Sequence, residues 1–339
     1  MNASATLCRG SGDAIESREA KVRCSRCAGT LEAQILLCDP VVDSLKCTRC
    51  GSALCAIDGI WRAIAPEHAS QLGASLSAYE AVREAEGRWS LDPDFYQSLP
   101  WRDTTGRFRE QWKIRACSFD FVRGRVLPAF MERLGRQRLR VLDVGAGNCW
   151  LSYRLALLDH DPTAVDIGVG RKDGLGAATH FKGILGQMFP RFQAEMDRLP
   201  FANGQFDLAI YNASFHYARD YDATVREAVR VLRPDGAILI VDSPTYRREA
   251  DGEAMKREKA IAFTRSFGTD LGGMGGQEYL TPERLARLEQ IGIRWRRYSP
   301  WYGWRWALRP MIARLAGRRR PSQFHIYLGT LAESAAEAK

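Results

Sequence analysis

The segment from Val141 to Asn148 constrains the fold of this 339-residue chain more than any other. It begins with Val141–Val144, an apolar and partly β-branched run interrupted by Asp143, which is typical of a strand buried in a sheet. Gly145 and Gly147 follow, and because glycine has no Cβ the backbone can turn tightly there and let a ligand approach. The pattern predicts a strand, a turn and a helix whose first N–H groups can cradle a nucleotide. The predicted helix has apolar residues at helical spacing, at Trp150, Leu151, Leu155 and Leu158.

A dinucleotide coenzyme would require one more glycine in this turn. The dinucleotide fingerprint places a third glycine three residues after the second, but position 150 of this chain is tryptophan. Asp143 stands just before the glycines, where a carboxylate would repel a diphosphate and attract an ammonium or sulfonium group. The turn therefore suits a cationic ligand better than a diphosphate.

A second acidic residue follows at the spacing expected for a ribose-binding carboxylate. The run Thr163–Asp166 predicts another strand, and Asp166 ends it 23 residues after Asp143. In nucleotide-binding α/β folds, a carboxylate roughly 20 residues beyond the glycine turn binds ribose hydroxyls, so Asp166 is the predicted ribose ligand. After it we expect a strand at Phe206–Asn212, with a loop at its carboxyl end at Ala213–Tyr217. A helix at Tyr221–Leu232, a turn at Arg233–Gly236 and a strand at Ala237–Asp242 are expected to follow.

Over residues 138–242 these features resemble motif I and the later motifs of the class I S-adenosylmethionine-dependent methyltransferases, in particular the methyltransferase type 11 group. The resemblance implies methyltransferase activity and an α/β, Rossmann-like fold with a mostly parallel, seven-stranded sheet. It also implies S-adenosylmethionine as cofactor. The positions that it assigns to cofactor binding are Asp143, Val144, Gly145, Ala146, Gly147, Asp166, Glu195, Met196, Asp197 and Asn212.

Two acidic residues compete for the adenine end of the cofactor. The resemblance places an acid near the adenine amino group, at a fixed offset before Leu199-Pro200-Phe201, and Glu195 occupies that position. Most relatives carry aspartate there, and Asp197 is the rival candidate. Both carboxylates could instead be solvated loop charges.

Methyl transfer from a sulfonium group requires few catalytic residues, because the donor is already activated. The protein mainly positions the acceptor and removes its proton where necessary. His216 is the candidate base because it lies just beyond the strand Phe206–Asn212 and histidine titrates near neutrality. A histidine that only forms the pocket wall is the alternative. Tyr211 and Asn212 are candidates for orienting the acceptor.

Two C-x-x-C motifs near the N-terminus predict a metal site. The pairs are separated by 19 residues, a spacing typical of zinc ribbons, and they supply four thiolates to one tetrahedral ion: Cys24, Cys27, Cys47 and Cys50. We expect structural Zn²⁺, because a closed four-sulfur site leaves no position for catalysis and a module this small needs metal to fold. An iron–sulfur site, and Cys38 or Cys55 as substitute ligands, are alternatives. The module resembles small zinc-ribbon proteins that activate methyltransferases.

The composition divides the chain into four parts. Residues 1–20 are small, polar and charged, so we expect a disordered tail, followed by a zinc ribbon at 21–65. Residues 66–135 are expected to form a helical linker and lid, and residues 136–332 the methyltransferase domain.

No run approaches about 18 apolar residues, so we expect a cytoplasmic protein, with peripheral membrane attachment as an alternative. Lid aromatics that could line a substrate chamber or pack in the core are Tyr79, Phe95, Tyr96, Trp101 and Trp112.

The positive charge is concentrated near the C-terminus. Residues 291–320 contain nine arginines and no acidic residue, which equals the net charge of +9 of the whole chain. The same window contains four of the nine tryptophans. Residues 295–320 could bind RNA, contact a membrane surface or lipid-like substrate, or pack on their own domain with solvated arginines. Pro310 is expected to limit any helix here to two short pieces.

The sequence therefore predicts a methyltransferase that acts on a small-molecule or lipid-linked acceptor, at oxygen or carbon. A ribosomal or transfer RNA methyltransferase is the second hypothesis. Ala213 and Ser214 replace the prolines of the Asn/Asp-Pro-Pro-Tyr signature, which disfavours methylation of nucleic-acid amines. A non-catalytic scaffold that only binds S-adenosylmethionine is the third hypothesis.

Overall fold

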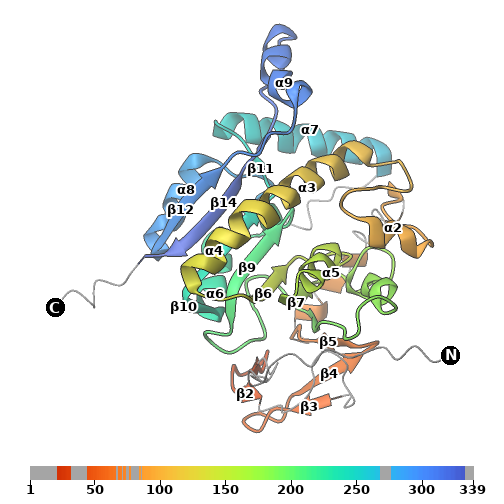
Figure 1. Cartoon of the computed structure of the whole chain (residues 1–339), viewed down its shortest axis with the longest axis vertical. Helices are drawn as coiled ribbons and strands as arrows, with labels where there is room; N and C mark the ends of the chain where they lie inside the picture. The colour runs from red at the N-terminus through yellow and green to blue at the C-terminus, as the bar shows by residue number, and fades with distance from the viewer. Residues whose placement is uncertain are drawn as a thin grey trace, which may run out of the picture.

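A long twisted sheet runs through the part of the chain that this computed structural model describes, which is residues 21–31, 44–65, 68–70, 72–73, 76–77, 84, 86–267 and 276–332 (Figure 1). Ten strands lie in the order β12-β14-β10-β9-β6-β7-β8-β5-β4-β3. Their bounds are β3 (Ser44–Lys46), β4 (Ala53–Ile57), β5 (Ile60–Arg62), β6 (Arg140–Val144), β7 (Asp161–Asp166), β8 (Arg191–Gln193), β9 (Phe206–Asn212), β10 (Leu232–Val241), β12 (Ile293–Tyr298) and β14 (Ile326–Leu331).

The seven strands from β12 to β8 in this order form the predicted Rossmann-like α/β sheet. Strands β10, β9, β6, β7 and β8 pair in parallel, whereas β14 pairs antiparallel with both β10 and β12. The central strands are apolar runs because helices cover both faces of the sheet, as in β9, where six of seven residues are buried. The predicted fold class is confirmed.

Helices cover both faces of this sheet (Figure 1). Within residues 66–135, where the sequence predicts a helical linker, α3 and α4 are joined through a π-helical turn. Helix α6 shows how sequence sets such an element: Asp220 caps it by accepting hydrogen bonds from the N–H groups of Asp222 and Ala223. The helix bounds are α2 (Pro93–Ser98), α3 (Arg109–Phe121), α4 (Leu127–Leu134), α5 (Trp150–Leu157), α6 (Tyr221–Val231), α7 (Glu249–Phe267), α8 (Pro282–Leu288) and α9 (Trp304–Leu315).

The N-terminal module, residues 21–31 and 44–65, continues the sheet beyond β8. Its last strand, β5, pairs in parallel with β8, so that Trp61 lies opposite Phe192. A second connection comes from β1 (Val22–Arg23), which pairs with β2 (Thr30–Leu31) and whose Arg23 N–H donates to the carbonyl of Pro200. The module therefore covers the edge of the sheet, an arrangement that the sequence did not indicate.

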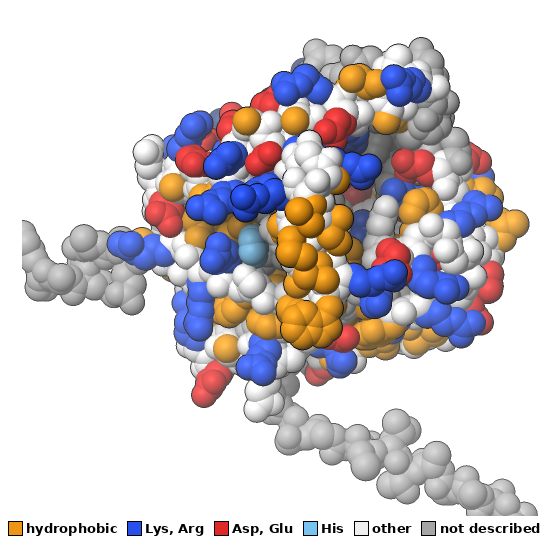
Figure 2. Space-filling view, turned by 90° about the horizontal axis from the view of Figure 1, so that it is seen from above, with side chains coloured by type: hydrophobic (Ala, Val, Ile, Leu, Met, Phe, Trp, Pro, Cys, Tyr) orange, Lys and Arg blue, Asp and Glu red, His pale blue; other side chains and the backbone are white. Residues whose placement is uncertain are grey.

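Helix α9 projects from the end of the molecule opposite the N-terminal module (Figure 1). Figure 2 looks onto this end and shows a band of hydrophobic side chains with basic side chains on both sides. The prediction that Pro310 divides this segment into two short helices is wrong, because α9 is continuous through it. Pro310 removes only the hydrogen bond to the Trp306 carbonyl, and on an exposed helix water can satisfy that oxygen.

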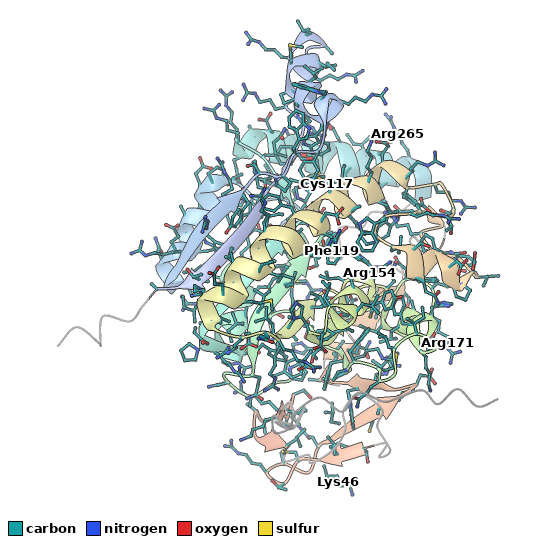
Figure 3. All side chains as sticks on the ribbon, viewed as in Figure 1. Lys46, Cys117, Phe119, Arg154, Arg171 and Arg265 are labelled. Atoms are coloured by element: carbon teal, nitrogen blue, oxygen red, sulfur yellow. The ribbon has the colours of Figure 1, made fainter. Side chains whose placement is uncertain are left out.

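Helix α3 contacts both the core and the loop that leads into α9. On its inner side the ring of Phe119 meets Trp150 of α5 edge to face, with ring centroids 5.6 Å apart (Figure 3). Toward α9, the Cys117 thiol donates to the carbonyl of Trp301, and the hydroxyl groups of Ser118 and Tyr302 lie 2.9 Å apart. Among the described residues, no helix is long and apolar enough to cross a bilayer.

Candidate functional site

The glycine turn between β6 and α5 forms as predicted, and its two glycines serve different purposes. Gly145 has a φ of +73°, and a Cβ there would lie 2.3 Å from the Cβ of Ser214. Gly147 has a φ of +52°, but its α-carbon faces open space. Gly145 is therefore required by close packing against the loop after β9, whereas Gly147 leaves the backbone open to a ligand.

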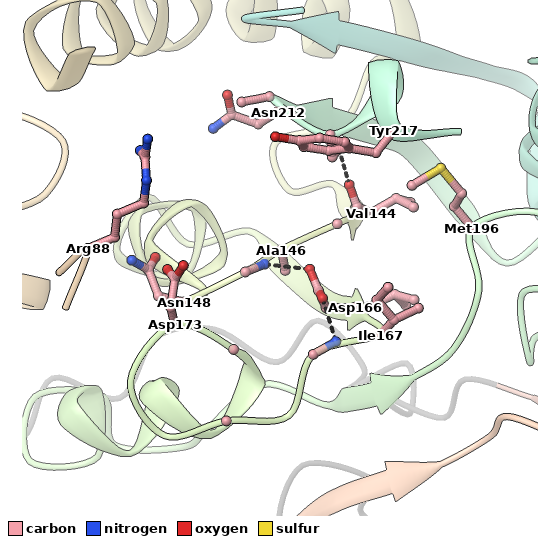
Figure 4. A pocket seen from close by; sticks show the side chains of 18 of the residues that line it. Arg88, Val144, Ala146, Asn148, Asp166, Ile167, Asp173, Met196, Asn212 and Tyr217 are labelled. Carbon is pink, nitrogen blue, oxygen red and sulfur yellow. Dashed lines mark hydrogen bonds between the residues drawn. The ribbon is translucent and has the colours of Figure 1, made fainter. Parts of the chain in front are cut away.

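Asp166 connects the glycine turn to the next loop. It ends β7, and its two carboxylate oxygens accept hydrogen bonds from the N–H groups of Gly147 at 2.8 Å and Gly168 at 2.7 Å (Figure 4). These bonds fix the carboxylate at the carboxyl edge of the sheet, where ligands of open α/β folds bind. Asp166 is therefore positioned before any ligand arrives.

A pocket of about 440 Å³ opens over this edge of the sheet (Figure 4). The predicted cofactor positions that line it are Val144, Gly145, Ala146, Gly147, Asp166, Glu195, Met196, Asp197 and Asn212. Neither Asp143 nor His216 is among its lining residues. Most of the predicted site therefore comes together around one cavity.

Asp143 is buried beneath the glycine turn. Its carboxylate accepts a hydrogen bond from the Ser152 hydroxyl of α5 at 2.7 Å, and burial raises its pKa to about 7. The expectation that this carboxylate faces a cationic ligand directly does not match the structure, because its side chain points to α5 and not to the pocket. Asp143 therefore lies behind residues 144–147, which line the pocket, and can affect a ligand only at a distance.

His216 is also buried behind the pocket wall. Its Nδ1 lies 3.3 Å from the Ser243 hydroxyl oxygen. Burial lowers its pKa to about 3, and the positive charges of Lys259 and Arg115 act in the same direction. The residue that lines the pocket is its neighbour Tyr217, whose ring centroid lies 4.2 Å from that of His216. Burial therefore makes His216 a weak base.

The two acids expected near adenine have different surroundings. Glu195 lies 3.0 Å from Nδ1 of His68, a residue that follows the N-terminal module, and Arg198 contacts the same imidazole. Asp197 is half-buried, and both burial and the nearby charge of Glu195 raise its pKa. His68 was missed in the sequence because it lies far from Glu195 along the chain and no motif connects them.

The rest of the pocket is aromatic and carries two arginines from the predicted lid. The guanidinium of Arg88 lies 4.2 Å above the ring of Phe108, and that of Arg115 lies 4.7 Å above Trp112. Of the five lid aromatics proposed for a chamber, Trp112 lines it. Phe95 and Tyr96 are buried outside the pocket lining, Trp101 is exposed at the surface, and Tyr79 lies outside the described residues. The aromatic lining residues are Trp89, Phe108, Trp112, Trp150 and Tyr217.

A loop after β7 contributes pocket residues that the sequence did not reveal. Arg171, Lys172 and Asp173 all line the cavity, and Lys172 forms an ion pair with Glu84 of the lid segment. In the sequence, these charged residues stand in a glycine-containing loop whose pattern does not differ from that of an ordinary solvent-exposed turn. Only the path of the chain past β7 shows that they line the pocket.

The four cysteines of the two C-x-x-C motifs meet at one point of the N-terminal module. Their sulfur atoms all lie within 4.8 Å of one another, with Cys24 and Cys50 3.7 Å apart and Cys27 and Cys47 3.5 Å apart. The N–H of Gly29 donates to the sulfur of Cys27 at 3.4 Å. Cys55 is not part of this group, and Cys38 lies outside the described residues. The donor set fits a tetrahedral, thiolate-binding ion.

Comparisons with known proteins agree with the fold. Residues 142–240 match the family model described as a methyltransferase domain. A ubiquinone biosynthesis O-methyltransferase from Caulobacter sp. (strain K31) is 29% identical over 45% of this chain and 63% of its own length. A malonyl-[acyl-carrier protein] O-methyltransferase from Geobacter sulfurreducens is 35% identical over 34% of this chain and 43% of its own. The chain thus spans between about two fifths and two thirds of these relatives.

Two further proteins extend the comparison. A demethylmenaquinone methyltransferase from Mycolicibacterium vanbaalenii is 31% identical over 34% of this chain and 50% of its own. Among solved structures, the 1,6-didemethyltoxoflavin-N1-methyltransferase of Burkholderia thailandensis is 15% identical, with a TM-score of 0.47, over 86% of this chain and all of that chain. The sheet order, with its parallel central strands, is that of a Rossmann-like α/β domain. Residues 142–240 form the segment of this domain that matches the family.

Proposed function

We propose that this chain is an S-adenosylmethionine-dependent methyltransferase that methylates oxygen or carbon of a small-molecule or lipid-linked acceptor. The observation that carries the proposal is the Asp166 carboxylate, held by the N–H groups of Gly147 and Gly168 at the wall of the pocket. A fixed carboxylate at the end of the second strand of the fold suits the two hydroxyls of a ribose. Trp150 at the position of the third fingerprint glycine disfavours a dinucleotide.

The pocket divides into a nucleoside half and an acceptor half. Gly147 and Asp166 would hold the ribose, and Glu195, Met196 and Asp197 would surround the adenine. The aromatic residues of the lid line the same pocket and can stack on a flat acceptor. Arg115 adds positive charge there, which favours an anionic or ionisable group such as a phenol, whereas Arg88 lines the same pocket with its charge paired to Glu86.

The positive charge of Arg115 reduces the need for a strong base. In the transfer, the methyl group leaves the sulfonium sulfur for the acceptor atom, and an acceptor O–H or C–H gives up its proton. Nearby guanidinium groups lower the pKa of such an acceptor by stabilising its anion. We therefore infer that His216, whose pKa burial lowers to about 3, positions Tyr217 and is not itself the base.

We propose in addition that Cys24, Cys27, Cys47 and Cys50 bind a structural Zn²⁺ ion in a zinc-ribbon module. A tetrahedral ion with metal–sulfur bonds of about 2.3 Å places its ligands about 3.8 Å apart, close to the sulfur separations of 3.7 and 3.5 Å. Four thiolates leave no position for substrate. The ion would therefore stabilise the module that covers β8 and would not take part in methyl transfer.

The acceptor class can be tested with methyl-labelled S-adenosylmethionine and fractionated cell extract. We expect purified protein to place label in the lipid or small-molecule fraction. Label confined to RNA would favour the second hypothesis, and binding of S-adenosylhomocysteine without labelling of any fraction would favour a scaffold. Asp166→Asn should reduce labelling at limiting cofactor concentration by about tenfold or more, whereas Asp222→Asn, on the exposed face of α6, should retain it.

A further inference from the structure

Helix α9 presents an apolar stripe to solvent. None of its twelve residues, all of which the structure describes, is buried. Trp304 is 76% exposed and Leu315 82% exposed, and the apolar side chains between them are about half exposed. With about 100° between successive residues, these side chains share roughly 100° of the helix circumference. The stripe consists of Trp304, Leu308, Met311, Ile312 and Leu315.

Arginines border this stripe on both sides. On a helical projection Arg305 lies along one border and Arg314 along the other, whereas the guanidinium of Arg309 folds toward Trp306 on the anchored side. Among the described residues, none of the three has an acidic side chain within ion-pair distance, whereas Arg319 at the base of the helix pairs with Glu258. Figure 2 shows the resulting pattern of a hydrophobic band between basic side chains. The surface of α9 therefore combines exposed apolar side chains with arginines that form no ion pair among the described residues.

The opposite side of the helix is anchored to the protein. Trp306 stacks on Phe324 of β13 (Gln323–Phe324), with ring centroids 5.4 Å apart. The guanidinium of Arg309 lies 3.8 Å above the same indole. Strand β13 pairs with β11 (Pro244–Thr245), so the anchor is tied to the segment after β10. The helix is therefore held with its apolar stripe outward.

We propose that α9 docks on the surface of an anionic phospholipid bilayer, with the stripe among the acyl chains and the arginines at the phosphates. Aliphatic side chains such as Leu308 and Leu315 gain little from RNA, which offers charge and base faces. A second copy of the same face would bring two sets of unpaired arginines together and would be repelled. A bilayer satisfies both parts of the surface, since its interior buries the stripe and its headgroups neutralise the arginines.

The position of α9 relates this docking to the pocket. Helix α3 carries Trp112 and Arg115 in the pocket wall, and the next turn of the same helix, at Cys117 and Ser118, contacts the loop that leads into α9. A bilayer under α9 would therefore lie close to the acceptor half of the pocket. The relation between the bilayer and the acceptor half of the pocket rests on the proposed function, whereas the docking of α9 on a bilayer does not.

The test is flotation of the purified full chain with lipid vesicles. We expect it to float with vesicles of phosphatidylglycerol and phosphatidylcholine and to remain largely unbound with phosphatidylcholine alone. Combining Leu308→Glu with Leu315→Glu should reduce the bound fraction at least about tenfold, because two apolar side chains lose their burial. Leu91→Glu is the matched control, since Leu91 is 83% exposed elsewhere and should bind as wild type does. Arg305→Gln with Arg314→Gln should remove the preference for phosphatidylglycerol.

Three outcomes would overturn the proposal. They are absence of flotation with anionic vesicles, unchanged flotation of the double glutamate variant, and a stripe-dependent dimer or RNA complex formed in place of vesicle binding. Titration of the same preparation with S-adenosylhomocysteine keeps the two proposals separate. Cofactor binding without flotation rejects only the membrane surface, whereas flotation without cofactor binding rejects only the methyltransferase.

Discussion

The two additions to the Rossmann-like core use their apolar residues in opposite ways. In the N-terminal module, Val22 and Trp61 are fully buried and β5 extends the sheet beyond β8. In α9, no residue is buried and Leu315 is 82% exposed. The first addition is thus part of the fold, and its hydrophobic burial contributes to stability. The second leaves its apolar surface for binding, so sequence hydrophobicity alone does not distinguish a core element from a docking element.

Metal removal should have the largest effect on the module and none on α9. Cys47→Ser removes one of four thiolates and should lower the free energy of unfolding by about 5 kcal/mol or more, or prevent soluble expression. Zinc content by elemental analysis and unfolding in urea measure the two effects. Cys55→Ser, in the same module but outside the cysteine cluster, should keep one zinc per chain. Equal zinc loss in both variants would reject the assigned ligand set.

Trp61→Ala compares the two additions directly. Trp61 is fully buried against Phe192, and its removal leaves a large cavity at the joint between module and sheet. The expected loss of stability in urea unfolding is about 3–5 kcal/mol. Leu315→Ala, its counterpart on α9, should change stability by less than about 0.5 kcal/mol. Similar losses in the two variants would mean that α9 belongs to the folded core.

Gly145→Ala and Gly317→Ala extend the comparison to backbone strain. Both glycines have positive φ, but a Cβ at Gly145 would collide with Ser214, whereas a Cβ at Gly317, just after α9, would meet nothing within 4 Å. Gly145→Ala should cost about 2–4 kcal/mol and abolish cofactor binding, and Gly317→Ala about 1 kcal/mol. Thermal unfolding and calorimetric titration measure these effects. Retained cofactor binding in Gly145→Ala would show that the turn tolerates displacement.

The pH dependence of stability should reveal the burial of His216. Its folded pKa of about 3 lies below the usual 6.5, so the unfolded chain binds a proton more readily between these values. Wild-type stability should therefore fall on acidification below pH 6.5, by at most about 1.4 kcal/mol per pH unit from this group. His216→Gln should lack that contribution, which unfolding in urea at several pH values would show.

The same variant also tests the proposed role of His216. If His216 positions Tyr217, His216→Gln should lower the rate of methyl transfer by less than about tenfold and leave the pH profile of the rate unchanged. Loss of activity by a factor of about 100 or more, together with loss of a titrating group from the profile, would identify His216 as the base.

The parts of the site that could be predicted are encoded by neighbouring residues. Gly145, Gly147 and Asp166 stand at the ends of apolar runs, and their positions follow from strand pattern and turn chemistry. The C-x-x-C pairs are equally local. For the same reason, most strands and helices between residues 141 and 242 were readable, because each carries its own periodicity. The exceptions are β8, which was not predicted, and the turn expected at Arg233–Gly236, which lies within β10.

The rest depends on contacts between distant segments, which no local pattern contains. The pairing of β5 with β8 and of His68 with Glu195 both join residues more than a hundred positions apart. The surroundings of His216 likewise come from other parts of the chain, at Ser243, Arg115 and Lys259, whereas Asp143 is held by Ser152 only nine residues away. The chemical type of each of these residues could be predicted from the sequence. Whether its side chain lines the pocket or is buried behind the pocket wall could not be predicted.

The central claim is that the turn and Asp166 receive S-adenosylmethionine and not a dinucleotide. Calorimetric titration of the full chain with S-adenosylhomocysteine and, in parallel, with NADH tests it most directly. We predict saturable binding of S-adenosylhomocysteine that Asp166→Asn weakens by about tenfold or more, and no binding of NADH. Saturation by NADH without any response to S-adenosylhomocysteine would contradict the claim.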